Sequence, residues 1–161
     1  MDRTRGFEEV NEYFRKNTLS PTLPTRGSKN SMAYDFYANN NYTINPNEIG
    51  KIWTDVKAYM QPNECLIINV RSSMGVKFML ANTSGWIDSD YYSNESNDGN
   101  IGVFLKNISD QPIIISRGER IAQGAFFNFL ISDNGNTEDK RIGGFGSTGK
   151  ENKWNLGILL N

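Results

Sequence analysis

Residues 64–70 read Glu-Cys-Leu-Ile-Ile-Asn-Val, and residues 71–75 continue with Arg-Ser-Ser-Met-Gly. A short apolar run bounded by turn residues is typical of a buried β-strand. Similar runs recur along the chain between Asn-, Asp- and Gly-rich stretches, and they are Tyr34–Ala38, Gly50–Lys57, Phe78–Leu80, Gly102–Leu105, Pro112–Ile115 and Gly124–Ile131. Short strands at regular spacing, without long helical patterns between them, predict an all-β sandwich, barrel or jelly roll.

The sequence pattern leaves the secondary structure open at the two ends of the chain and at one turn. Arg5–Lys16 fits either an amphipathic helix or an opening strand. Ser72 or Ser73 could cap a short helix that enters Met74–Lys77. The polar segment Ser132–Asn136 is typical of a hinge, after which the chain leaves the body. We therefore expect one domain, with a β-barrel body at residues 1–132 and a C-terminal arm and tail at 133–161.

Composition excludes several kinds of chemistry. The 161 residues carry a net charge of −1, which gives no support for binding nucleic acid or a membrane. The chain has no histidine, so Ser-His-Asp and Cys-His catalysis and histidine-ligated zinc are excluded. Its one cysteine, Cys65, lies in an apolar run and is expected to be buried rather than nucleophilic. With no signal peptide visible, a cytoplasmic location is expected.

Residues 141–150 read Arg-Ile-Gly-Gly-Phe-Gly-Ser-Thr-Gly-Lys, a composition suited to cradling phosphate. Gly144–Lys150 matches the start of the P-loop pattern, but Glu151 replaces the Ser or Thr that would hold magnesium. A P-loop also joins a buried strand to a long helix, and a polar segment precedes this run near the C-terminus. The glycines are therefore expected to bind phosphate as part of a terminal arm.

Five segments of the chain, taken in order, resemble the five motifs of the homotrimeric dUTP diphosphatases (dUTPases). They are Ala33–Ala38, Arg71–Gly75, Gly85–Tyr91, Arg117–Gln123 and Arg141–Gly149. The resemblance implies a jelly-roll-like β-barrel with a flexible glycine-rich C-terminal arm, assembled as a homotrimer with active sites shared between subunits. It also implies hydrolysis of dUTP to dUMP and pyrophosphate with Mg²⁺, which lowers dUTP and supplies dUMP for dTMP synthesis.

The resemblance also implies roles for individual residues. Asp88 would be the general base that activates a water toward the α-phosphorus. Tyr91 would lie against the deoxyribose and exclude a 2′-hydroxyl. The uracil edge would be read by Asn82 and by the backbone around Trp86 and Ile87.

The remaining roles concern the phosphates and the metal. The phosphates would be held by Arg71, Ser72, Ser73 and Gln123. On the arm, Arg141 would reach the γ-phosphate, Phe145 would stack over the uracil, and Gly146, Ser147 and Thr148 would wrap the phosphates. Asp35 would act on the metal indirectly, through water.

Three features depart from the family pattern. Ala33 stands where glycine is usual, the polar loop Tyr92–Asn100 is long, and an apolar tail, Glu151–Asn161, follows the fifth motif. The loop leaves open a second function, that of a dUTP-sensing regulatory protein that binds a protein partner. A third possibility is the related dCTP deaminase branch, which uses a glutamate base in place of the Ile-Asp-Ser-Asp-Tyr neighbourhood seen here.

Overall fold

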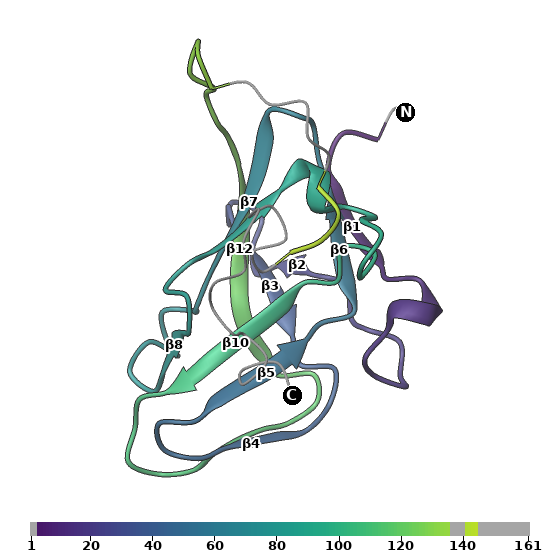
Figure 1. The fold of residues 1–161 in the computed structure, drawn as a ribbon. Coiled ribbons are helices and arrows are strands. Elements are labelled where there is room, and N and C mark those ends of the chain that lie inside the picture. Colours follow the sequence, from purple (N-terminus) through teal and green to yellow (C-terminus); the bar gives the residue numbers. More distant parts are fainter. Residues whose placement is uncertain (1–2, 136–140, 145–161) are drawn as a thin grey trace.

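The computed structural model describes residues 3–135 and 141–144, and these residues form an all-β fold (Figure 1). The predicted fold class is confirmed. The strands are β1 (Gly6–Glu9), β2 (Thr25–Arg26), β3 (Tyr34–Tyr37), β4 (Tyr42–Ile44), β5 (Ile49–Trp53), β6 (Val56–Tyr59), β7 (Glu64–Asn69), β8 (Phe78–Leu80), β9 (Gly85–Asp88), β10 (Gly102–Asn107), β11 (Ile113–Ile115) and β12 (Arg120–Asn128). Two 3₁₀ turns complete the set, η1 (Glu12–Phe14) and η2 (Ser89–Tyr91).

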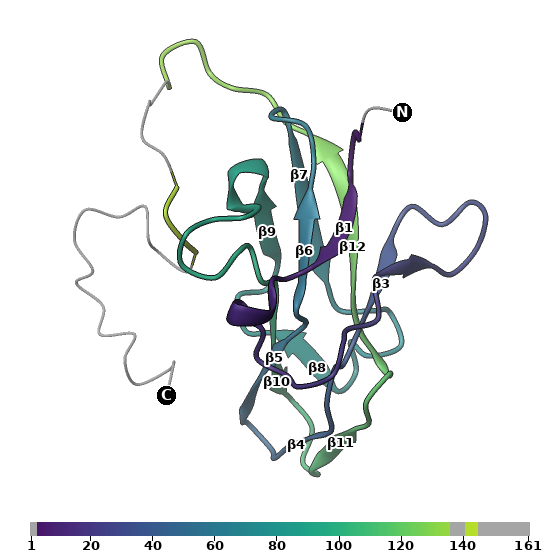
Figure 2. The same ribbon diagram turned by 90° about the vertical axis from the view of Figure 1, so that its right-hand side faces the viewer.

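The strands form four antiparallel groups that surround one core. The largest is a five-stranded sheet in the order β2-β3-β12-β7-β9, and a three-stranded sheet has the order β5-β10-β8. The pairs β1-β6 and β11-β4 extend the wall of the barrel. Figures 1 and 2 place the β4–β11 pair at the end of the molecule opposite the N-terminus.

Alternating side chains on these strands build the core. In β10, Val103, Leu105 and Asn107 are buried while the residues between them are half-buried, as expected where one face of a strand packs inward. The fully buried apolar side chains include Phe36, Ile52, Leu66, Ile101, Leu105 and Ile121. They come from strands and loops far apart in the sequence, so a single core holds the body together.

The structure resolves the open question at the N-terminus. The segment Arg5–Lys16 begins as strand β1 and ends in the short turn η1, rather than forming an amphipathic helix. Strand β1 pairs with β6, with Phe7 opposite Ala58. Phe7 lies edge-on against Tyr34 and Phe36, so this edge strand contributes to the apolar core.

Two sequence predictions need correction. The run Gly50–Lys57 is not one strand, because Asp55 adopts a positive φ of 55° and breaks the run into β5 and β6. The helix predicted to enter Met74–Lys77 does not form. That segment makes successive turns, in which the Met74 amide donates to the Arg71 carbonyl at 2.9 Å. None of the helical segments within residues 3–135 and 141–144 has the length and apolar character that crossing a membrane requires.

Candidate active site

A cavity of about 200 Å³ opens beside strand β9. Its wall contains six residues that the sequence analysis had singled out, namely Asn82, Trp86, Ile87, Asp88, Tyr91 and Arg141. The floor is apolar and comes from Ile68, Leu80 and Val103. The cavity thus combines an apolar slot with a carboxylate, an amide, a phenol and a guanidinium.

Strand pairing explains how Asp88 reaches this cavity. Strand β9 pairs with β7, and Asp88 lies opposite Cys65 at the end of the pair. Cys65 is buried, as predicted, and burial followed by the charge of Asp88 raises the pKa of its thiol. A thiol that stays protonated is a poor nucleophile, so Cys65 is not a candidate for covalent chemistry.

The turn η2 brings Tyr91 back over the cavity. Tyr91 is 5% exposed, and its hydroxyl donates to the Asn100 carbonyl at 2.8 Å. Burial raises the pKa of this phenol, so the hydroxyl remains protonated and able to donate. The ring therefore forms a fixed part of the cavity wall.

Residues 141–144 cover one side of the cavity. Arg141 forms an ion pair with Asp88, and its Nε donates to Asp90 at 2.7 Å. A Cβ atom added at Gly144 would lie 2.7 Å from Cε2 of Tyr91, so only glycine allows this close approach. Figure 2 shows this yellow segment beside the teal loop that follows β9.

A second polar cluster lies on strands β3, β12 and β7. Asp35 is buried and accepts from Arg71 Nε at 2.8 Å and from Arg120 Nη1 at 3.3 Å. In the sheet register, Gln123 pairs with Asp35 on one side and with Asn69 on the other. A hollow of about 690 Å³ beside this cluster is lined in part by Arg71, Ser73, Lys77 and Arg120. Cationic and hydroxyl groups lining an open hollow suit the binding of an anion.

The register shows that one chain keeps this cluster apart from the cavity. Asp35 and Asp88 lie on β3 and β9, three strand spacings apart in the order β3-β12-β7-β9, which is roughly 14 Å. Asp88 also lies level with Cys65, four residues along β7 from the level of Asp35, or roughly 13 Å. The two groups cannot meet on the same few atoms of one ligand.

Known proteins with similar sequences identify the family to which the chain belongs. A family model described as dUTPase matches residues 20–149. The chain belongs to the dUTPase family. A Lactococcus lactis protein named deoxyuridine 5′-triphosphate nucleotidohydrolase is 41% identical over 151 residues, which cover 91% of this chain and 99% of that protein.

Solved dUTPase structures agree with the fold. The dUTPase from Streptococcus mutans has a TM-score of 0.70 and 37% identity, covering 80% of this chain and 99% of that chain. The dUTPase of Staphylococcus bacteriophage 80alpha, with 19% identity and a TM-score of 0.64, covers 86% and 98% of the two chains and shares the fold.

Most of the site residues predicted from the dUTPase resemblance fall into the two places described above. Arg71 and Ser73 line the second hollow, Gln123 stands in its sheet, and Ser72 is exposed in the adjoining turn. Phe145, Gly146, Ser147 and Thr148 lie outside the described residues, as does the tail Glu151–Asn161. Arg141 forms ion pairs with the carboxylates of Asp88 and Asp90.

The structure also identifies residues to which the sequence analysis gave no role. Arg120 shares Asp35 with Arg71, Asp90 shares Arg141 with Asp88, and Asn97 contacts the Tyr91 hydroxyl. Arg120 and Asp90 do lie inside the fourth and third dUTPase motifs, so motif position was an available signal for them. Asn97 lies in the long polar loop and carries no such signal.

Proposed function

We propose that this protein is a dUTP diphosphatase, which uses one water to convert dUTP into dUMP and pyrophosphate. The observation that carries the proposal is the cavity in which Asp88, Tyr91 and Asn82 converge. Membership of the dUTPase family and 41% identity to a named dUTP nucleotidohydrolase support the same reaction.

Asp88 is the general base in this proposal. Its side chain is 51% exposed at the rim of the cavity, where a water can reach both the carboxylate and an α-phosphorus. The water loses a proton to the carboxylate as its oxygen bonds to phosphorus, and pyrophosphate leaves. A carboxylate is a weak base near neutral pH, so positioning and charge stabilisation supply most of the acceleration.

The same cavity selects the nucleoside. Asn82 and the backbone of Trp86–Asp88 read the uracil edge, and the apolar floor accepts the face of the base. Built hydrogen bonds discriminate strongly, because a wrong base leaves buried groups unpaired. The Tyr91 ring packs against the deoxyribose and leaves no room for a 2′-hydroxyl.

The second cluster holds the phosphates. Arg71, Ser72, Ser73 and Gln123 bind the triphosphate oxygens, with Arg71 as a charge-assisted donor. Both carboxylate oxygens of Asp35 already accept from guanidinium groups, which fits an indirect role near a metal. Among residues 3–135 and 141–144, no group of three carboxylate or cysteine side chains could cage a metal. This fits Mg²⁺, which is commonly held by substrate phosphates and waters and would neutralise developing charge there.

The site is completed between copies of the chain. Asp88 and Asp35 of one chain lie too far apart to serve one triphosphate, so the cavity of one subunit faces the phosphate cluster of another in a homotrimer. Arg141 leaves Asp88 and Asp90 for the γ-phosphate when nucleotide binds. The arm within residues 133–161 then closes, with Phe145 over the uracil and residues 146–148 around the phosphates. The cytoplasmic location expected from the sequence stays a prediction.

A pyrophosphate-release assay across the four deoxynucleoside triphosphates, dUTP and UTP tests this function, with and without Mg²⁺. We expect turnover of dUTP alone, and its loss when Mg²⁺ is chelated. Ammonia release from dCTP would instead indicate the deaminase branch. Tight dUTP binding without pyrophosphate release would favour the sensing protein.

A further inference from the structure

The long polar loop Tyr92–Asn100 is folded onto the body of its own chain. Three of its polar side chains, those of Asn94, Asp98 and Asn100, are buried. Gly99 has a positive φ of 82°, and a Cβ atom there would lie 2.8 Å from the Tyr91 carbonyl oxygen. A loop with this internal bonding is built to hold a shape rather than to offer its polar groups to a partner.

Asn97 is the residue of this loop that contacts the cavity wall. Its Nδ2 donates to the Tyr91 hydroxyl at 2.7 Å, and the same hydroxyl donates to the Asn100 carbonyl at 2.8 Å. The Asn97 Oδ1 atom accepts from Asn94 Nδ2 at 2.8 Å and from the Gly99 amide at 3.1 Å. The Tyr91 hydroxyl thus has two hydrogen-bond partners, the Asn97 amide and the Asn100 carbonyl, and the Asn97 side chain is itself fixed by hydrogen bonds within the loop.

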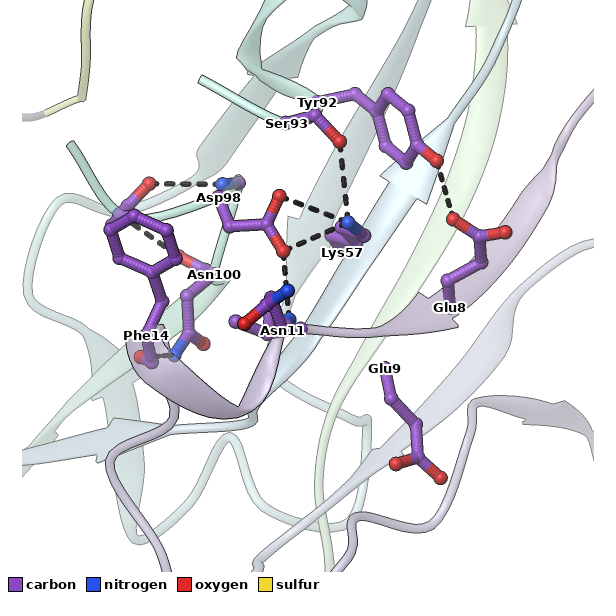
Figure 3. Close-up of polar contacts among 12 residues, drawn as sticks. Glu8, Glu9, Asn11, Phe14, Lys57, Tyr92, Ser93, Asp98 and Asn100 are labelled. Carbon is purple, nitrogen blue, oxygen red and sulfur yellow. Dashed lines mark hydrogen bonds and ion pairs between the residues drawn. The ribbon is translucent and has the colours of Figure 1, made fainter. Parts of the chain in front are cut away.

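An ion pair fastens the loop to the first strands (Figure 3). Lys57 Nζ on β6 lies 2.8 and 2.9 Å from the two carboxylate oxygens of Asp98, and their side chains are only 12% and 11% exposed. The backbone amide of Asn11 donates to the same carboxylate at 2.8 Å, and Lys57 also donates to Ser93 Oγ at 3.2 Å. The middle of the loop therefore cannot move without breaking shielded polar contacts.

The end of the loop is fastened by a second carboxylate. Asn100 Nδ2 donates to Asp55 Oδ1 at 2.8 Å, and the Asp55 amide donates back to Asn100 Oδ1 at 3.0 Å. Asp55 is fully buried and also accepts from the backbone amides of Lys16 and Asn17. Both residues that hold the Tyr91 hydroxyl are therefore fixed, directly or through the loop, to the body of the chain.

We infer that Asn97 is a positioning residue that sets the selectivity for deoxyribose over ribose by holding the Tyr91 ring in place. The inference rests on the proposed function, in which this ring excludes the 2′-hydroxyl. Steric exclusion of one oxygen atom fails if the ring relaxes by a fraction of its thickness, so the ring needs support from the residues behind it. Asn97 gives that support without touching the nucleotide.

The test is the ratio of dUMP to UMP affinity, measured by titration calorimetry on the full-length chain. We expect Asn97→Ala to lower this ratio about fivefold, the effect of one neutral hydrogen bond. Asn97→Asp keeps the acceptor for Asn94 and Gly99, but the single Tyr91 proton can then serve either the new carboxylate or the Asn100 carbonyl, so one of the two contacts is lost and the ratio should fall even if the alanine variant folds poorly. Ser96→Ala is the matched control, because among the described residues Ser96 Oγ bonds within the loop alone, to Asn94 Oδ1 at 2.8 Å; it should leave the ratio unchanged.

A double mutant shows whether Asn97 acts through the phenol. Tyr91→Phe should lower the ratio by itself, and adding Asn97→Ala should lower it little further, because the shared contact is already gone. A general loss of structure would weaken both nucleotides equally and leave the ratio unchanged. An unchanged ratio in a folded Asn97 variant, a full additional loss in the Tyr91→Phe background, or a wild-type protein without preference for dUMP would overturn the inference. Selective dUMP binding without dUTP hydrolysis would contradict the proposed function alone.

Discussion

Asp88 stands at the end of β9, where its carboxylate faces both the cavity and the Arg141 guanidinium. We predict that Asp88→Asn lowers pyrophosphate release from dUTP by at least about a thousandfold, within the range of a general base, while dUMP binding survives. Ser89→Ala is the control, because Ser89 lies in the same turn and bonds to the Pro62 carbonyl. Turnover near the wild-type rate in Asp88→Asn would remove this residue from the role.

The carboxyl group of Glu64 couples the stability of the fold to acid pH. The guanidinium of Arg5 donates to its carboxylate at 3.0 Å and, together with the Gln61 amide, holds the pKa of Glu64 below its ordinary value despite burial. The pKa of this carboxyl is lower in the folded state than in the unfolded state, where it is about 4.3. The ionised carboxyl therefore stabilises the fold at pH values above about 4.3, and this stabilisation is lost as the pH falls through the pKa of the folded state.

We therefore predict that Glu64→Gln flattens the fall of Tm between pH 5 and pH 3, measured by circular dichroism. At neutral pH the variant should be the less stable protein. Glu95→Gln, which removes an exposed carboxylate in the loop after Tyr91, should keep the wild-type slope. Parallel curves for Glu64→Gln and wild type would show that this carboxyl does not couple folding to protons.

Residue roles were predictable as far as motifs reach. The resemblance picked out Asn82, Asp88 and Tyr91, and the structure brings all three to one cavity. It gave no hint of Asn97, because its contact with Tyr91 depends on how a loop of turns folds back. Contacts between side chains that depend on the conformation of a loop produce no periodic pattern of apolar residues from which they could be predicted.

At the scale of elements, we expect the strands up to β12 to determine folding and the arm that follows β12 to contribute to turnover. Every strand in the described part of the chain lies within residues 6–128, so a chain ending after Lys140 keeps all of these strands. We predict that this truncation folds and assembles but loses at least about a hundredfold in turnover, because it lacks the arm that we propose closes over the phosphates. Circular dichroism, size-exclusion chromatography and pyrophosphate release measure the three properties.

A chain ending after Lys150 is the matched control for this truncation. It keeps the arm and lacks only residues 151–161, so we expect it to retain turnover. Loss of activity in this control would assign the effect to the tail. Full activity in the shorter chain would exclude the arm from catalysis.

The corner between β5 and β6 depends on one carboxylate. Asp55 has a positive φ and accepts from five N–H groups, two of the backbone and three of the side chains of Asn17, Asn39 and Asn100. Asp55→Ala would remove the acceptor that these five donors share, two of which belong to the buried side chains of Asn39 and Asn100, and we predict a loss of about 3 kcal/mol or more in the free energy of unfolding.

Denaturant unfolding at one fixed protein concentration measures this loss. Asp110→Ala, at an exposed turn after β10, should change the stability by less than about 0.5 kcal/mol. Equal stabilities for the two variants would contradict the role of Asp55.

Strands were predictable from the sequence where they are apolar and contain no residue with a positive φ angle. Tyr34–Ala38 and Glu64–Val70 match β3 and β7 closely. The break at Asp55 was missed because the flanking residues read as one apolar run, while the donors around its carboxylate come from segments far away in the sequence. Strand β4 was missed for a related reason, since Tyr42–Ile44 is too short to stand out and forms by pairing with β11.

At the scale of the whole molecule, the two halves of the proposed site lie on separate parts of one chain. The cavity contains Asp88 on β9, and the phosphate cluster contains Asp35 on β3, three strand spacings away. The sequence resemblance implied shared sites, and the register of β3, β12, β7 and β9 gives the separation on which our proposal of a shared site rests.

Subunit complementation tests this arrangement most directly. Asp88→Asn and Arg71→Ala proteins, each inactive alone, are unfolded together, refolded as a 1:1 mixture and assayed for pyrophosphate release from dUTP. Random assembly pairs an intact cavity with an intact phosphate cluster in about a quarter of the sites, so we expect about a quarter of the wild-type activity. A mixture as inactive as its two components would contradict a dUTP-hydrolysing site built between subunits.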